Sequence, residues 1–292
     1  MSVALPRRQR RRGKLQKEPI GIYVFLTIIG IIMFLPMYQL IITAFKPLEE
    51  LFLFPPLYYV KQPTLQNFEE LLIAAGAGWV PFSRYVFNSV FVTLSVVSLH
   101  VFFACLAAYP LAKSRAPGVN VLFQLAVAAL MFSAQITNIP RYLIVNGLGW
   151  INTYWALIIP GIGSAYGVFL MKQFLEQVPN ALIEAAKIDG ASEFTIFRKL
   201  ILPLSRPAWS TLIIFSWIST WNDSWSPMVF TQSEAMKTMP LAIQTIFSGA
   251  NVVARQGANA AAALIQTAPT VIIFLLLQKQ VISTMAYSGI KS

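Results

Sequence analysis

Long apolar segments dominate this chain of 292 residues and restrict the folds that are open to it. Six of them stand out, at about residues 20–45, 85–112, 119–140, 152–175, 209–231 and 261–283. An α-helix needs roughly 20 mainly apolar residues to cross the hydrocarbon core of a bilayer. None of the segments alternates apolar and polar residues as the short strands of a membrane β-barrel do. The sequence therefore predicts an all-α integral membrane protein with six transmembrane helices.

Charged residues make up only 11% of the chain, against 57% for hydrophobic residues. Soluble proteins carry roughly 25% charged residues. Cytoplasmic loops of membrane proteins hold the excess of Lys and Arg. If the N-terminus is inside, 16 of the 22 basic residues lie on the cytoplasmic side, and both termini are cytoplasmic. Those 16 are Arg7, Arg8, Arg10, Arg11, Arg12, Lys14, Lys17, Lys113, Arg115, Lys172, Lys187, Arg198, Lys199, Arg206, Lys279 and Lys291. The external ones are then Lys46, Lys61, Arg84, Arg141, Lys237 and Arg255.

Much of the net charge of +11 comes from a basic run at the start of the chain. Such a run attracts either nucleic acid or the anionic lipid of the cytoplasmic leaflet. Because it directly precedes an apolar segment, an anchor on lipid is the simpler interpretation. The segment is longer than the apolar core of a secretory signal and lacks a small-residue cleavage site, so we expect it to stay uncleaved. The predicted organisation is a basic cytoplasmic arm, residues 1–18, and a single transmembrane domain, residues 19–292.

A polar stretch, residues 176–208, lies between two predicted spans on the cytoplasmic side. Its first part reads PNALIEAAKIDG, in which the alanines and Glu184 favour a helix. Gly190 is expected to end this helix, because glycine adopts the left-handed conformation that commonly follows a helix end. Ser192 then suits the cap of a second helix, with Glu193 in its first turn. The stretch is predicted to be two short helices joined at a sharp corner.

The second helix is expected to carry an apolar face, because its large apolar residues recur at spacings of three and four. They are Phe194, Phe197, Leu200 and Ile201. Pro203 is expected to close this helix, and Pro207 suits the first turn of the next one. On composition alone, the whole stretch is equally compatible with an ordinary solvated connection.

The pattern of the stretch is more specific than its composition. EAAKIDGASEFTIFRKLILPLSRP resembles the cytoplasmic signature loop of ATP-binding-cassette importer permeases, whose carbohydrate-importing branch typically reads EAAxxDGAxxxxxFxxxxLPxxxP. TWNDSW in the fifth span, TMPLAIQT after it and the tail LLLQKQVIS then GIKS extend the similarity over nearly the whole chain. The chain resembles the smaller permease subunit of a sugar importer, similar to the second permease of the maltose importer. The tail departs from the commoner GAVKG ending.

This resemblance implies a fold, a set of partners and a role for the loop. The fold would be that of a type I ABC importer permease in the bacterial inner membrane. The partners would be a second, distinct permease, two cytoplasmic ATPase subunits that hold ATP and Mg, and an extracytoplasmic binding protein that delivers the sugar. The substrate would be a sugar or oligosaccharide, with a likeness to members that handle uronate-containing polysaccharides. The residues expected to couple the loop to the ATPase are Glu184, Ala185, Ala186, Asp189, Gly190, Ala191, Phe194, Phe197, Leu200 and Pro203.

Polar residues inside the predicted spans are candidates for the substrate pathway, because such groups are costly in lipid. Asp223 lies near the middle of the fifth span beside Asn222. Trp217, Trp221 and Trp225 recur at helical spacing, and their faces suit the C–H faces of a sugar. Alternatively, the tryptophans belong to an interfacial aromatic belt, and the two polar residues hold helices together.

His100 is the one histidine of the chain and falls near the centre of the second span. A proton relay would need more acidic residues in the spans, so a hydrogen bond across an interface between permeases is the simpler interpretation. Cys105, the one cysteine, also falls in a span, so it predicts neither an internal disulfide nor a metal cluster. A small packed hydrophobe is the expected role of this side chain.

The sequence holds no GxxxxGK[ST] phosphate loop, so ATP hydrolysis is expected on other chains. No cofactor or metal is expected on this chain, and no paired carboxylates indicate an enzyme. The remaining alternatives are a permease for another small polar solute, an ion-coupled carrier and a membrane enzyme.

Overall fold

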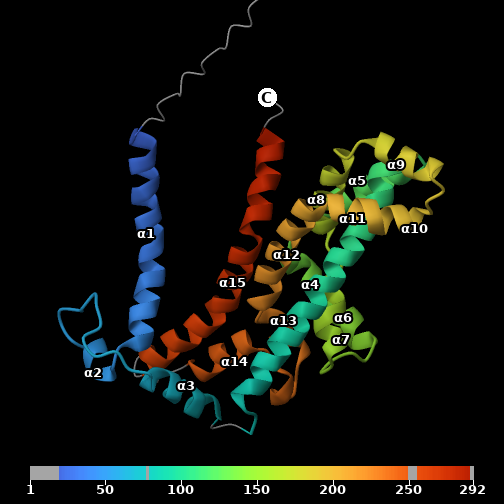
Figure 1. The fold of residues 1–292 in the computed structure, drawn as a ribbon. Helices are drawn as coiled ribbons and strands as arrows, with labels where there is room; N and C mark the ends of the chain where they lie inside the picture. The colour runs from blue at the N-terminus through green and yellow to red at the C-terminus, as the bar shows by residue number, and fades with distance from the viewer. Residues whose placement is uncertain (1–19, 77–78, 249–254, 290–292) are drawn as a thin grey trace, which may run out of the picture.

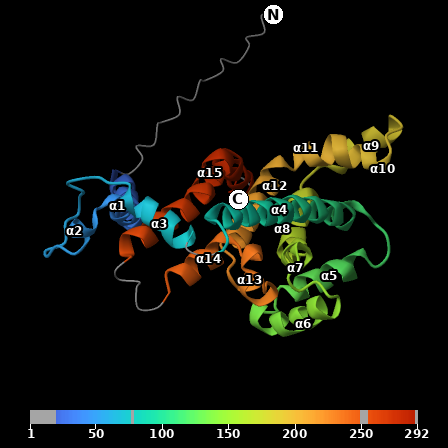
Figure 2. The ribbon, with the colours of Figure 1, turned by 90° about the horizontal axis from the view of Figure 1, so that it is seen from below.

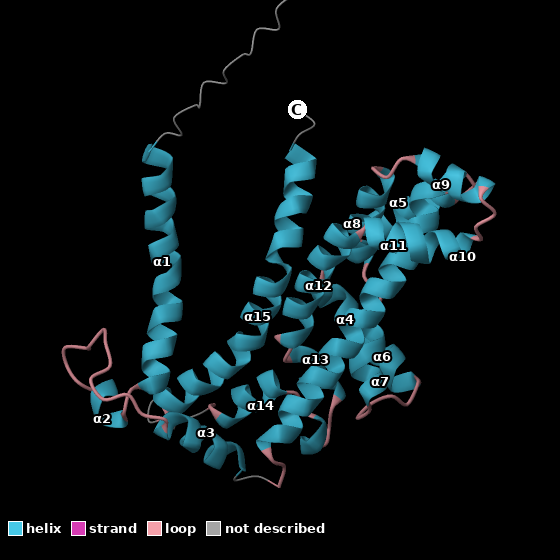
Figure 3. Cartoon of the chain, in the orientation of Figure 1, coloured by secondary structure: helices cyan, strands magenta, loops and turns pink. Residues whose placement is uncertain are grey.

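The computed structural model describes residues 20–76, 79–248 and 255–289, drawn in colour in Figure 1. Within these ranges the elements are helices and loops, with no strand (Figure 3), so the all-α prediction is confirmed. The basic arm, residues 1–18, lies outside the described residues.

Four helices or helix pairs are long and apolar enough to cross a membrane within the described ranges. They are α1 (Ile20–Phe45), α4 (Phe82–Lys113), the pair α7 (Tyr154–Ile162) and α8 (Ala165–Glu176), and α15 (Gln256–Gly289). The shorter helices α2 (Leu48–Leu51) and α3 (Gln66–Gly76) lie between α1 and α4. The ends of α1 and α15 nearest the chain termini point to the same side of the molecule as α9 (Asn180–Ile188) and α10 (Glu193–Ile196), as Figure 1 shows. We call this side the α9 end and the opposite side the α3 end.

The third predicted span, residues 119–140, is not one continuous helix. It consists of α5 (Val119–Ala129) and the start of α6 (Ala134–Gly147), which are separated by a turn. Ser133 is extended there, and its carbonyl accepts from the N–H groups of Ile136 and Thr137 as α6 begins. At 1.5 Å per residue α5 is only about 16 Å long, too short for a hydrocarbon core of about 30 Å. The expectation of one continuous helix over this segment is therefore wrong, because the chain turns before α6 at Ser133, and hydropathy does not register such a turn.

The fourth and fifth predicted spans are also broken. α7 and α8 are separated by Gly163 and Ser164, and the Ser164 hydroxyl accepts from the Gly167 N–H at 3.2 Å. The fifth span divides into α12 (Arg206–Trp221) and α13 (Trp225–Phe230). Gly163 and Ser164 at the first break and Asp223 at the second line a common cavity of the bundle.

α4 is the central helix of the fold. It packs against α7, α8 and α12, and α12 packs in turn against α15 (Figures 1 and 2). Two glycines allow this close packing: a Cβ at Gly167 would come within 2.6 Å of His100, and one at Gly161 within 3.0 Å of Val96. α1 contacts α15 and α3, and its buried residues all lie near its C-terminal end. Most of α1 is therefore uncovered in the single chain.

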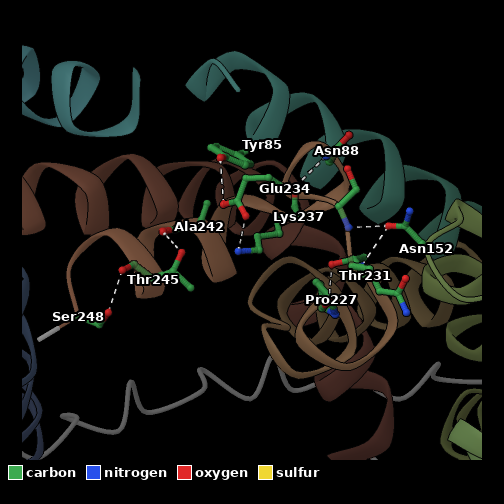
Figure 4. A network of polar contacts seen from close by, with 12 residues as sticks. Tyr85, Asn88, Asn152, Pro227, Thr231, Glu234, Lys237, Ala242, Thr245 and Ser248 are labelled. Atoms are coloured by element: carbon green, nitrogen blue, oxygen red, sulfur yellow. Dashed lines mark hydrogen bonds and ion pairs between the residues drawn. The ribbon is translucent and has the colours of Figure 1, made fainter. Parts of the chain in front are cut away.

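The segment after α13 folds back onto the α3 end of α4, as Figure 4 shows. The buried Asn88 amide donates to the carbonyls of Ala235 and Lys237, both at 2.8 Å, and accepts from the Tyr154 hydroxyl at 2.7 Å. Glu234, the first residue of the short helix η2 (Glu234–Met236), pairs with Lys237 directly after it at 2.6 Å. These contacts fix the approach to α14 (Met239–Ile246) and clamp the loop to α4.

Candidate coupling element and transport cavity

The polar stretch forms the corner that its sequence predicts. Helix α9 (Asn180–Ile188) is followed by Gly190 with φ +80°, a left-handed conformation. The Gly190 N–H donates to the Lys187 carbonyl and the Ala191 N–H to the Ala186 carbonyl, both at 3.0 Å. This pair of bonds is the Schellman motif, which satisfies carbonyls at a helix end. Glycine is needed at the corner because a Cβ is disfavoured at positive φ.

The second helix begins as predicted but ends later. The Ser192 hydroxyl accepts from the Thr195 N–H at 3.3 Å and caps α10 (Glu193–Ile196). The chain continues as a π-helical turn, η1 (Phe197–Ile201), and then α11 (Leu202–Leu204). Pro203 therefore does not end the helix. The wider turn before it explains why: proline lacks an N–H and its ring clashes with the carbonyl four residues back in a regular α-helix.

One face of this corner anchors it to the rest of the protein. Ile183, Ile196, Phe197 and Ile201 are buried in a cluster with residues of α4, α8 and α12. Phe197 is 3% exposed, and its ring centroid lies 6.0 Å from that of Tyr109 on α4. The prediction that Phe197 docks on the ATPase is wrong for this chain, because this residue holds the corner in place. Leu200, half-buried, packs against the same cluster.

The opposite face is free within this chain. Phe194 is 65% exposed and Ile188 is 87% exposed. Glu184, Ala185, Asp189, Gly190 and Pro203 are exposed as well, whereas Ala186 and Ala191 are half-buried. Sequence reasoning missed Ile188, although Leu182, Ala185 and Ile188 recur at a spacing of three and all are exposed. We call the exposed face of α9 and α10 the coupling face.

Polar contacts tie the coupling element to the last turns of α4. Glu193 pairs with Lys187 at 2.6 Å across the corner and accepts from the Tyr109 hydroxyl at 2.9 Å. The hydrogen bonds from Lys187 and Tyr109 lower the pKa of the Glu193 carboxyl. Lys113 at the end of α4 donates to the Val178 carbonyl at 2.5 Å and to the Asn180 side chain at 3.0 Å. A cavity of about 770 Å³ lies between α4 and α9–α10, and the exposed residues Glu184, Lys187 and Phe194 are part of its lining.

A second cavity, of about 670 Å³, lies between α4, α6, α7, α8, α12 and α13. We call it the transport cavity. Its lining includes His100, Arg141, Asp223 and Trp225, together with the broken ends of α7 and α8. The His100 ring nitrogen Nδ1 lies 3.1 Å from the Ile162 carbonyl, so this side chain contacts its own chain at the helix break. Sequence reasoning assigned Arg141 to the external side and missed it as a cavity residue. The signal that could have identified it was its charge in a largely uncharged stretch.

The predicted tryptophan stripe does not exist. α12 ends at Trp221, so Trp225 lies on another helix. Trp217 and Trp221 are 6% and 2% exposed and stack with ring centroids 5.3 Å apart. The Trp221 indole donates to the Gln266 carbonyl of α15 at 2.8 Å, so these two residues join helices rather than line the cavity. Only Trp225 of the three is in the lining of the transport cavity.

Asn222 and Asp223 cause the break that separates the tryptophans. The Asn222 amide donates to the Ile218 carbonyl at 2.9 Å, and its oxygen accepts from the Gln266 side chain at 3.3 Å. The Asp223 carboxylate accepts from the Ser226 N–H at 3.1 Å at the start of α13. Such bonds to nearby backbone compete with helix continuation. Asn222 therefore joins α12 to α15, and Asp223 both starts α13 and lines the transport cavity.

Comparison with known proteins agrees with this architecture. Residues 17–287 match the family model for the binding-protein-dependent transport system inner membrane component. The chain belongs to this family. The permease is 31% identical over 273 residues to an arabinooligosaccharides transport system permease protein of Halalkalibacterium halodurans, with 90% of this chain and 93% of the relative covered.

Two solved structures resemble the fold of this permease. One is the crystal structure of a bacterial ABC transporter involved in the import of the acidic polysaccharide alginate, with a TM-score of 0.77, 21% identity and coverage of 89% of this chain and 95% of that chain. The other is the alginate ABC transporter in complex with an alginate pentasaccharide-bound periplasmic protein, with a TM-score of 0.57, 15% identity and coverage of 88% and 92%. The permease thus has the fold of an ABC importer permease and is a multi-pass membrane protein.

Proposed function

We propose that this permease is a transmembrane subunit of an ATP-driven importer that moves a sugar or oligosaccharide from an extracytoplasmic binding protein into the cytoplasm. The family match supports the use of a binding protein. The substrates in the names of the relative and of the similar structures are oligosaccharides and an acidic polysaccharide. Sugars from complex, uronate-containing polysaccharides are therefore the leading substrate class.

The proposed topology has six membrane crossings, with both termini in the cytoplasm of a bacterium and the protein in its inner membrane. The crossings are α1, α4, α5 with α6, α7 with α8, α12 with α13, and α15. Two observations support this arrangement: the terminal ends of α1 and α15 lie on the same side as α9 and α10 (Figure 1), and most basic residues fall on that side of the proposed topology. Residues 1–18 are the proposed cytoplasmic arm, and residues 19–292 the single permease domain.

The coupling element carries the functional proposal. Residues 176–208 form a corner that is anchored on one face and exposed on the other, as a transmitter of motion must be. We propose that an ATPase subunit grips the coupling face, with Glu184 and Asp189 setting the register and Phe194 and Ile188 filling apolar hollows. ATP and Mg bind on that partner, which hydrolyses ATP, and this chain supplies no catalytic residue.

The remaining proposed partner is a second, distinct permease. The most apolar window of α1 has no buried residue within the single chain. A partner helix or lipid must cover that surface, and a heterodimer of permeases would enclose the transport cavity between its subunits. The second permease would then share the contacts to the sugar.

Purification of the complex tests the proposal. An importer subunit is expected to hold an ATPase and a second permease in detergent, and the complex in nanodiscs should hydrolyse ATP faster when binding protein and sugar are added together. Transport by the isolated chain, driven by an ion gradient and independent of ATP, would refute the proposal in favour of a coupled carrier.

A further inference from the structure

Arg141 is a half-buried cation in the lining of the transport cavity. It lies on α6, within the half of the molecule where the helices α7 and α8 break. Among the residues that the structure describes, none forms a hydrogen bond or an ion pair with its guanidinium. Arg84, by contrast, donates to the Ala235 carbonyl and to the Tyr154 hydroxyl, both at 3.2 Å. The positive charge of Arg141 is thus left without a counterion in a cavity between apolar helices.

An unpaired cation in such a place is costly, and membrane proteins keep one mainly where it serves transport. Arginine presents a planar fork of N–H donors that fits a carboxylate with two parallel hydrogen bonds. A neutral sugar offers hydroxyls but no charge to pair with the guanidinium. A sugar carboxylate has both the charge and the geometry that match this fork.

The anion of the cavity does not neutralise Arg141. Asp223 lines the same cavity, but its carboxylate caps α13 by accepting from the Ser226 N–H, and it forms no ion pair with Arg141. The cavity therefore holds a separate cation and anion. A sugar acid matches both: its carboxylate pairs with a cation, while its hydroxyls donate to a carboxylate. Trp225, also in the lining, offers an aromatic face to the C–H side of the ring.

We propose that the transport cavity selects sugars that carry a carboxylate, and that Arg141 is the residue that recognises this group. The inference rests on the proposed importer function and its leading substrate class, and adds that this chain itself selects for the carboxylate and that Arg141 recognises it. At about 670 Å³ the cavity falls within the roughly 300–1,000 Å³ of small-molecule sites, so a sugar unit fits beside Arg141.

The test compares two probes of the same chain length, trigalacturonate and its fully methyl-esterified form, which lacks the charge. Binding of each to the complete importer in nanodiscs is measured by calorimetry without the binding protein, so that only the transmembrane cavity is sampled. We expect the carboxylated probe to bind about 10- to 100-fold more tightly than the ester, as for a charge-assisted pair. Arg141→Gln should remove this preference and leave ester binding unchanged, and Arg141→Lys should restore part of it. Lys61→Gln, which removes one exposed charge away from the cavity, is the matched control.

Two outcomes would overturn the inference: equal binding of both probes by the unmodified importer, or a preference for the acid that survives in Arg141→Gln. A loss of assembly in Arg141→Gln but not in Lys61→Gln would also overturn it, because Arg141 would then pair with the second permease. The proposed importer function fails separately, if no sugar in a panel of neutral and acidic oligosaccharides stimulates ATP hydrolysis with binding protein present. Stimulation by neutral sugars alone would refute the carboxylate preference and leave the importer function standing.

Discussion

Substitution of Gly190 tests the backbone geometry of the coupling corner without removing a side-chain contact. The residue has φ +80°, and beyond its chain neighbours no atom lies within 4 Å of the position that a Cβ would take, so a new side chain meets strain but no clash. An L-residue in this conformation costs roughly 1–2 kcal/mol. That energy corresponds to about a 5- to 30-fold drop in the equilibrium ratio of the observed corner to other conformations. Asparagine tolerates positive φ better than alanine, and valine worse.

The expected order of sugar-stimulated ATP hydrolysis is therefore Gly190, then Gly190→Asn, Gly190→Ala and Gly190→Val. Gly149 provides the control, because it also has a positive φ, +67°, and open space around it, but lies in the connection between α6 and α7. Gly149→Ala should lower the thermal stability by a similar amount while coupling stays intact. Equal coupling in all four Gly190 forms, or equal loss in Gly149→Ala, would refute the argument that the corner angle transmits the motion.

Further substitutions test the ion pair of the coupling corner, the hydrogen bonds that hold the loop before α14, and the roles of two tryptophans. Glu193→Gln removes an ion pair that is largely exposed, so it should lower the free energy of unfolding by only about 0.2–1 kcal/mol. Because the pKa of Glu193 is lowered in the folded protein, this stabilisation is present at neutral pH and is lost as the pH falls through the folded pKa. A stability difference from wild type that stays constant down to pH 3 would contradict this. Asn88→Ala removes three hydrogen bonds at about 0.5–1.5 kcal/mol each and should free the loop before α14 to hydrogen exchange, whereas unchanged protection there would argue against the clamp. Trp217→Ala should destabilise the fold by about 3–5 kcal/mol, because this side chain is buried. Trp225→Ala should mainly reduce sugar uptake at normal expression, because this side chain lines the transport cavity. Reduced uptake in a stable Trp217→Ala, with a destabilised Trp225→Ala, would show that the sugar passes elsewhere.

Local signals predicted the coupling corner well. Gly190 and Ser192 act through their own backbone and their immediate neighbours, and the structure shows the left-handed glycine and the capping serine as expected. The role of Phe197 depends instead on which helix or protein its apolar face packs against. Its spacing identified an apolar face but not whether that face meets α4 or another protein, because the fold of the chain decides between them.

The interrupted spans show the limit of hydropathy. The segments 119–140 and 209–231 are apolar enough to span, yet the structure breaks both. At the first break the Ser133 carbonyl accepts from the first N–H groups of α6, and at the second the Asp223 carboxylate accepts from the Ser226 N–H. Because α12 ends at Trp221, Trp225 lies on a different helix from Trp217 and Trp221, and the three do not form the predicted stripe. Arg141 was predicted to lie in an external loop, but α6 continues to Gly147, past the predicted end of the third span at residue 140. Arg141 is therefore part of a helix that lines the cavity. Helix breaks of this kind require the tertiary contacts that stabilise both halves.

Site-directed labelling of the coupling face tests the central claim most directly. Cys105 is fully buried, so a new cysteine is the reactive one. Ile188→Cys marks the coupling face, and Phe54→Cys, 94% exposed in the native side chain, marks the α3 end. With a membrane-impermeant maleimide, we expect Ile188→Cys to react only from the cytoplasmic side and to be protected when the ATPase subunits are bound. Phe54→Cys should react only from outside and should be indifferent to the ATPase. Labelling of Ile188→Cys from outside, or its full reactivity in the assembled complex, would contradict the account.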